Sequence, residues 1–166
     1  MIVQIHDAIE ALLSGDADFL ADVRALELGA QGQAAVFQIL HSLRDPAQVH
    51  PSKLPAVMLE KGDDEIESLS NTGDDGGFSV IGYTQQGMAA DLFIGMQWHQ
   101  ADPERAYRQR LGLLPVFVDL FLRNPDPGGA TNVYVRRMEF DRGALHPIQT
   151  ALVTVRIEYA QPRISR

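Results

Sequence analysis

The side chains best able to carry out chemistry are scattered along this sequence. The five histidines, His6, His41, His50, His99 and His146, show neither the HxxxH nor the HExxH spacing that places two imidazoles on one zinc ion. The nucleophile elbow G-x-S-x-G and the two glycine-rich phosphate motifs are absent, and there are no cysteines for a thiolate site or a disulfide. The sequence therefore predicts no enzyme active site, no metal and no cofactor.

Carboxylates form the strongest local concentration of charge. They are Glu60, Asp63, Asp64, Glu65, Glu67, Asp74 and Asp75, with Lys61 as the only cation among them. Carboxylate oxygens suit calcium, and this stretch could hold such a hard cation, but the spaced ligands of an EF-hand loop are missing. The four glycines between residues 62 and 77 favour a different interpretation, a mobile, solvated acidic loop between two strands.

A second group of charges falls on the predicted strands of the C-terminal part. The dipeptide Arg136-Arg137 could indicate a phosphate site, but neighbouring residues of a strand point to opposite faces, so the two guanidinium groups are not expected to act as one clamp. Pairing between subunits is the alternative use of these charges. The candidate residues for a contact with a neighbouring subunit are therefore Arg136, Arg137, Glu139, Arg156 and Glu158.

Composition limits the class of protein. The net charge of -8, from 22 acidic and 14 basic residues, disfavours a general nucleic-acid clamp, because phosphate backbones are bound by clustered lysines and arginines. With 166 residues, 45% of them hydrophobic, the chain is predicted to form one domain, residues 1–166. It shows no signal peptide and no apolar stretch able to cross a bilayer, so a soluble protein of the cell interior or of a virion is expected.

The elements that would position these residues are clearest between residues 88 and 159, where the spacing of apolar residues predicts the order strand, helix, strand, strand. The first strand places four apolar residues on one face: Leu92, Ile94, Met96 and Trp98. Trp98 is interpreted as a core residue rather than an interface anchor. A helix is then predicted to begin at Asp102, because Asp caps helices and the following Pro103 and Glu104 suit a first helical turn.

Five apolar residues of this helix are spaced four, three, four and three apart and are expected to form the stripe that lies on the sheet: Tyr107, Leu111, Leu114, Val118 and Phe121. Gly112 and Pro115 interrupt the pattern, so a kink or a break into two helices is expected. Strands follow at 132–140 and 149–159, and their short connection makes them antiparallel neighbours. In the first of them, strict alternation puts Val133 and Val135 on the face opposite to Met138 and Phe140.

The N-terminal half is predicted to begin with an amphipathic helix that ends near Gly15, followed by a short helix capped by Asp16 or Asp18. The run 36–43 has helical spacing, although Val36 to Leu40 could also form a strand. Further strands are expected at 54–60 and 78–83, with a turn at 85–87. Together the elements predict an α+β fold with a mixed or antiparallel sheet of about four to five strands and helices packed on one face.

The order of these elements resembles the tail-terminator, or tail-completion, proteins of long-tailed bacteriophages, the family of the lambda-type minor tail protein U. The resemblance is carried by Ile9 to Leu13, Leu54-Pro55-Ala56-Val57, the strand to Trp98, Ala101-Asp102-Pro103-Glu104, and Ala151 to Tyr159. The segment from Phe19 to Ser52 and the helix around Gly112 and Pro115 depart from the shorter members of the family.

The resemblance implies a small α+β protein that caps the tail tube as a ring, often a hexamer, in the virion tail, after assembly in the host cytoplasm. Such a ring ends tube polymerisation and offers the surface that joins the head through its neck. The implied partners are further copies, the tube protein and a neck protein, with DNA passing through the lumen. The acidic residues are then expected to face the lumen or the tube, where they would repel DNA: Asp63, Asp64, Glu65, Asp74 and Asp75.

Two other functions remain compatible with the sequence. One is a neck connector or another tail protein of similar build. The other is an enzyme or small-ligand binder whose pocket would lie between sheet and helix, and which would need polar groups pointing inward. The residues assigned to inward positions are instead apolar: Val153, Val155, Ile157 and Leu111.

Overall fold

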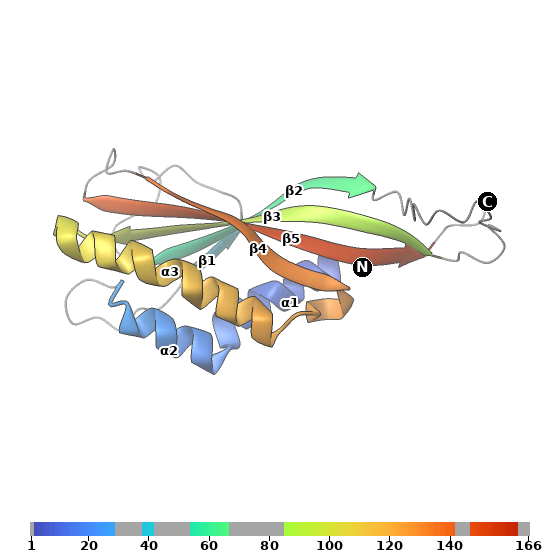
Figure 1. The fold of residues 1–166 in the computed structure, drawn as a ribbon, viewed down its shortest axis with the longest axis horizontal. Coiled ribbons are helices and arrows are strands. Elements are labelled where there is room, and N and C mark those ends of the chain that lie inside the picture. Colours follow the sequence, from blue (N-terminus) through green and yellow to red (C-terminus); the bar gives the residue numbers. More distant parts are fainter. Residues whose placement is uncertain (1, 29–37, 42–53, 67–84, 142–146, 163–166) are drawn as a thin grey trace, which may run out of the picture.

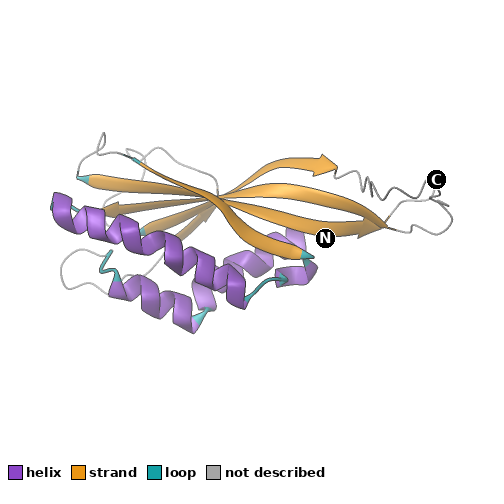
Figure 2. Cartoon of the chain, viewed as in Figure 1, coloured by secondary structure: helices purple, strands orange, loops and turns teal. Residues whose placement is uncertain are grey.

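The computed structural model describes residues 2–28, 38–41, 54–66, 85–141 and 147–162. Its described part contains a five-stranded sheet in the order β1-β2-β3-β5-β4, with three α-helices lying on one face of the sheet (Figure 1; Figure 2). The elements are α1 (Ile2–Gly15), α2 (Ala17–Ala25), β1 (Gln38–His41), β2 (Ala56–Ile66), β3 (Gln85–His99), α3 (Pro103–Arg123), the 3-10 turn η3 (Pro127–Gly129), β4 (Asn132–Phe140) and β5 (Ile148–Pro162). The predicted α+β class is confirmed.

The sheet is mixed, because β1 pairs with β2 in parallel and all other pairs are antiparallel. The strands β3 and β5 form its centre and pair along their whole length, from Gln85 opposite Pro162 to His99 opposite Ile148. The two predicted C-terminal strands are confirmed as antiparallel neighbours, and β4 has the predicted bounds. Long non-local pairing of this kind makes β3 and β5 the frame on which the helices are placed.

Two sequence interpretations of the strands need correction. The turn expected at 85–87 is wrong, since Gln85 already belongs to β3. The run 36–43 is not helical at Gln38–His41, where the strand alternative is confirmed by pairing with β2. Helical spacing in so short a run does not distinguish a helix from a buried strand, and only the partner strand decides. The strand expected at 78–83 lies outside the described residues.

The first two helices form as expected and are separated by a single capping residue. Asp16 is the N-cap of α2, and its Oδ1 accepts a hydrogen bond from the Phe19 backbone N–H at 2.8 Å. Asp16 also receives hydrogen bonds from the Arg123 guanidinium at 3.3 Å and the Asn124 amide at 3.4 Å, both from the end of α3. These donors, the Phe19 N–H first, lower the pKa of the Asp16 carboxyl, so the ionised cap joins α2 to α3.

The third helix begins where it was predicted, but it buries a different face. Asp102 Oδ1 accepts from the backbone N–H groups of Glu104 at 2.9 Å and Arg105 at 3.3 Å, with Pro103 in the first helical position. The residues that face the sheet and the other helices are Ala106, Gln109, Leu113, Val116, Phe117, Leu120 and Phe121. Of the predicted stripe only Phe121 is buried, whereas Tyr107, Leu111 and Leu114 are exposed by 57%, 59% and 42%.

Of the two alternatives predicted at Gly112 and Pro115, the break into two helices is wrong, because α3 is one helix that continues through Pro115. The glycine at position 112 is explained by the packing of α3 against the end of α2. A Cβ on Gly112 would lie 2.3 Å from Leu26 Cδ2, so the glycine lets α2 approach α3 closely. The exposed side chain of Leu111 and the position of Gly112 against Leu26 together show how α3 is rotated. It turns the Gly112 side towards α2 and leaves the Tyr107, Leu111 and Leu114 side open.

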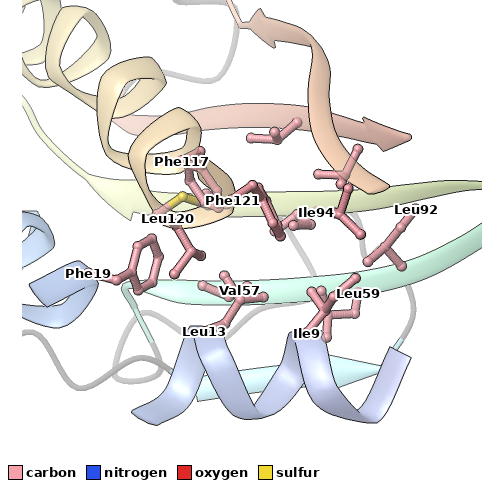
Figure 3. Packing of buried hydrophobic residues seen from close by; sticks show 14 of the residues in the cluster. Ile9, Leu13, Phe19, Val57, Leu59, Leu92, Ile94, Phe117, Leu120 and Phe121 are labelled. Atoms are coloured by element: carbon pink, nitrogen blue, oxygen red, sulfur yellow. The ribbon is translucent and has the colours of Figure 1, made fainter. Parts of the chain in front are cut away.

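The core lies between the sheet and the helices, and Figure 3 shows its packing from close by. Ile9 and Leu13 of α1 lie against Val57 and Leu59 of β2, and the phenylalanines of α3 lie above the sheet (Figure 3). The predicted inward face of β3 is confirmed, since Leu92, Ile94, Met96 and Trp98 are exposed by 1% or less. In the described part, no helix is both long and apolar enough to cross a membrane.

Trp98 and Gln109 form a polar bridge through this core that links β3 and α3 to the end of α2. The Trp98 indole N–H donates to Gln109 Oε1 at 2.8 Å, and Gln109 Nε2 donates to the carbonyl oxygens of Leu26 and Glu27 at 3.1 and 3.0 Å. Both side chains are nearly fully buried. Every polar atom of the Gln109 amide thus has a partner, which is the condition for a glutamine to be tolerated at this depth. Trp98 is a core residue, as predicted.

Candidate functional site

The charged residues predicted from the sequence gather on the sheet face opposite the helices. The register places Asp91 of β3 opposite Arg156 of β5, and Arg156 opposite Tyr134 of β4. Because directly opposite residues of an antiparallel pair share a face, these three side chains form a row across three strands. The row is centred on the two longest strands, so its geometry is fixed by the best-paired part of the sheet.

Asp91 is the centre of this charged face. Its Oδ1 accepts a hydrogen bond from Arg156 Nη1 at 3.2 Å, and its Oδ2 accepts one from Arg136 Nη1 at 3.2 Å. The Arg156 side chain is only 11% exposed and that of Asp91 21%, whereas the Arg136 side chain is 57% exposed. One carboxylate therefore holds a nearly buried arginine on one side and an accessible arginine on the other, so Asp91 fixes the arrangement of both.

A bulge in β4 brings the two adjacent arginines to the same face. Val135 pairs with Val155 and Arg137 pairs with Thr154, so Arg136 is an extra residue with no partner position in β5. The strict alternation expected for β4 is therefore wrong: Val133, Val135, Met138 and Phe140 all pack on the core. Arg136 and Arg137 both lie on the outer face as a result, and the argument that they must point to opposite faces fails.

The remaining predicted interface residues surround this centre. Arg137 Nη2 lies 2.5 Å from Glu139 Oε1, and both side chains are largely exposed. The Tyr134 hydroxyl donates to Glu158 Oε1 at 3.4 Å. Partial burial, with the Glu158 carboxylate second, raises the pKa of the Tyr134 phenol, so the hydroxyl keeps its proton and remains a donor. The structure thus brings together all five predicted interface residues and adds Asp91 and Tyr134.

The predicted acidic loop is in part a strand. Asp63, Asp64 and Glu65 belong to β2, whose pairing with β3 continues past an irregularity between Lys61 and Asp64. Gly62 stands at this irregularity, where a Cβ would lie 2.8 Å from the Asp91 carbonyl oxygen. The glycines and the run of acidic charge favoured a loop, but pairing with β3 continues the strand through residues of low strand propensity. The predicted site residues Asp74 and Asp75 lie outside the described residues.

The chemistry available on the outer face is ion pairing and hydrogen bonding. Within the described ranges no group of three His, Cys, Asp or Glu side chains is placed to hold a metal ion. The described acids and bases of this face are engaged with one another, as in Asp91 with Arg136 and Arg156. Such an arrangement gives the face a fixed pattern of charge, which is suited to orienting a macromolecular partner.

Sequence reasoning missed Asp91 and Gln109. Asp91 could have been found from its place on the polar face of the predicted strand, but its partners depend on the register between β3 and β5 and on the bulge in β4. Gln109 stands at a helical position that faces the core, in a helix whose buried face was assigned to other residues. A glutamine between two arginines gave no sign that an indole would need it as an acceptor.

Comparison with known proteins gives a likeness of fold and no family. No model of a protein family matches this chain, and no curated protein matches it. Among solved structures, the fold is similar to that of a chain in the virion of a native gene transfer agent (GTA) particle, with 15% sequence identity and a TM-score of 0.51. The similar region covers 92% of this chain and 92% of that chain. At this identity the likeness is one of fold.

Proposed function

We propose that this protein is a structural component of a tailed phage or phage-like particle, and that it caps the tail tube as a ring. The observation that carries the proposal is the likeness of fold, over 92% of both chains, to a chain of a gene transfer agent virion. The order of elements, which resembles tail terminators in the sequence, supports the finer role. A ring is built when one surface of a subunit meets a different surface of its neighbour, and the charged outer face offers fixed charges for such contacts.

In this proposal the ring ends tube polymerisation and presents a joining surface for the neck. Its partners are further copies of the chain, the tube protein and a neck protein. The exposed charges Arg136, Arg137 and Glu139 are proposed to orient a neighbouring subunit or the tube protein. Asp91, which also pairs with the nearly buried Arg156, is proposed to hold Arg136 in position for this contact. A neck connector is the second candidate, because the likeness to a virion chain supports it equally.

Removal of the gene from the phage or phage-like element that encodes this chain tests the function. We expect tubes of uncontrolled length and heads without tails, both seen by negative-stain electron microscopy, and recovery when the wild-type chain is supplied. A neck connector would instead leave tubes of normal length that fail to join heads. Particles of normal length and normal yield without the gene would contradict both roles.

The acidic residues of and beyond β2 are proposed to face the lumen or the tube. Neutralising Asp63 and Asp64, or Asp74 and Asp75, to asparagine is expected to impair DNA delivery or tube joining, because the lumen would lose charge that repels the DNA backbone. The measurement is the titre of infectious or transducing particles, beside the midpoint of thermal unfolding of the purified variants.

The control is a double variant with the same loss of charge elsewhere, Asp119→Asn with Asp126→Asn, at two exposed positions. We expect this variant to keep the wild-type titre. An unchanged titre in both acidic variants would exclude the lumenal role for these residues, and an equal fall in the control would attribute the effect to net charge alone.

A further inference from the structure

The outer side of α3 carries an apolar stripe that the fold does not use. Of the six large hydrophobic residues that are exposed in the described part, four belong to α3 and lie along one side of it: Tyr107, Leu111, Leu114 and Leu122. Their spacing of four, three and eight residues keeps them on one side of a helix with 3.6 residues per turn, and Val118 completes the row. Single exposed apolar residues are ordinary, but a continuous row of them along a helix indicates a surface that packs on something.

Arginines flank this stripe. Arg108 lies beside it and pairs with Glu104 at 2.6 Å, but both side chains are 75% exposed, and an exposed pair of this kind contributes little. Arg110 lies on the other flank and donates to the Asp141 carbonyl oxygen at 3.2 Å. The helix has four arginines and two carboxylates in a chain whose net charge is -8. The partner that best matches α3 therefore has an apolar centre with acidic neighbours.

The same chain presents one exposed valine with acidic neighbours on α1. Val3 is exposed by 66%, and Asp7, one helical turn later on the same side, is exposed too. α1 contains no lysine or arginine and carries Asp7 and Glu10. In Figure 3, α1 lies along β2, whereas α3 contacts β4 at the other side of the sheet order. The basic and the acidic helix thus belong to opposite sides of the helical layer.

We propose that the outer stripe of α3 packs on α1 of a second copy of this chain, with Arg108 beside Asp7 of that copy. The contact is between two different surfaces, so a pair of subunits still has one free α3 stripe at one end and one free α1 at the other, and repetition leads to a closed ring or an open filament. This inference rests on the proposed function in that a ring needs such a contact, but it can be tested on the purified protein alone. It also explains why α3 carries leucines that are exposed and do not pack in the core.

The first test is the mass of the wild-type chain and of Leu111→Asp, measured by light scattering over a range of concentrations. We expect the wild type to assemble, and Leu111→Asp to weaken assembly at least about tenfold in dissociation constant, because a carboxylate would be buried against an apolar surface with acidic neighbours. Ala21→Asp, a new carboxylate at an exposed position of α2, is the control and should assemble like the wild type. Circular dichroism should show all three folded alike, since each altered position is on the surface.

The second test is a charge exchange. Arg108→Asp alone should weaken assembly, and the combination Arg108→Asp with Asp7→Arg should restore it, because the pair across the contact would be rebuilt with opposite polarity. Suppose that Leu111→Asp and Arg108→Asp both weaken assembly, but that Arg108→Asp combined with Asp7→Arg assembles no better than Arg108→Asp alone. This result would overturn α1 as the receiving surface. It would point instead to another acidic surface or to a different virion protein as the occupant of the stripe.

The remaining outcomes separate this inference from the proposed function. If Leu111→Asp assembles like the wild type, the α3 contact is overturned while the ring proposal stands. If the wild type is a monomer at every concentration, the self-contact is overturned, and the phenotype of the gene deletion still decides the role in the tail. If the charge exchange restores assembly but particles without the gene are normal, the contact stands and the tail-capping function fails.

Discussion

Replacing Phe117 by alanine is expected to lower the free energy of unfolding by about 3–5 kcal/mol, the range for removing a buried phenylalanine from a packed core. Phe117 is fully buried in α3, and its ring meets that of Phe19 in α2 edge to face, with centroids 5.4 Å apart and an interplanar angle of 65°. The substitution removes the ring and leaves a cavity between α2, α3 and the sheet (Figure 3). Urea unfolding followed by circular dichroism measures the loss.

A control for this prediction is Asp119→Ala, at an exposed position of the same helix. We expect a change within about 0.5 kcal/mol there, because little apolar area leaves or enters water on folding. The double-mutant cycle of Phe117→Ala with Phe19→Ala isolates the ring pair, for which about 0.5–1.5 kcal/mol of coupling is expected. A loss below about 1 kcal/mol in Phe117→Ala would show that α3 does not bury the side assigned to it.

Replacing Asp91 by alanine is expected to destabilise the fold by about 2–3 kcal/mol, less than the value for fully buried ion pairs, because both partners keep some access to water. The variant would leave Arg156, with its side chain 11% exposed, without the carboxylate that accepts its hydrogen bond, and would free Arg136 as well. The loss should shrink when Arg156 is also changed to methionine, since the uncompensated charge is then removed. Urea unfolding at one fixed ionic strength measures both variants.

The control is Glu139→Ala, which breaks a pair with Arg137 on the same face where both side chains are largely exposed. Exposed pairs contribute roughly 0–1 kcal/mol, so this variant should unfold almost like the wild type. Equal losses in Asp91→Ala and Glu139→Ala would contradict the assignment of Asp91 as the centre of the charged face. A further consequence of that assignment is that Asp91→Ala should disturb any partner that binds through Arg136, while Glu139→Ala should leave the position of Arg136 unchanged.

Much of the local structure could be predicted because its causes are local. The cap at Asp102, the first two helices and the alternation in β5 depend on neighbours within a few residues, and each forms as the sequence indicates. The inward face of β3 followed from four apolar residues at every second position, which leaves one choice of buried face. The α+β class follows from the order of such elements.

For the charged outer face, the sequence could predict which residues take part but not how they contact one another. The sequence determined that Arg136, Arg137, Glu139, Arg156 and Glu158 lie on strands, but not that Asp91 joins two of these arginines. The bulge in β4 decided that both adjacent arginines share a face, and a bulge depends on how two strands pair rather than on the alternation within one of them. In β2, pairing with β3 likewise extended a strand through Asp64 and Glu65, against their low strand propensity.

The sequence by itself determined that α3 is a helix with apolar residues on more than one side, and the tertiary structure alone decided which side is buried. Both the row with Leu111 and the row with Phe117 have helical spacing, so the period cannot choose between them. The choice is made by Gly112 against Leu26, by Gln109 against the Leu26 carbonyl oxygen and by Phe117 against Phe19, each of which pairs residues far apart in the chain. Packing of distant side chains therefore selected the core face and left the other row exposed.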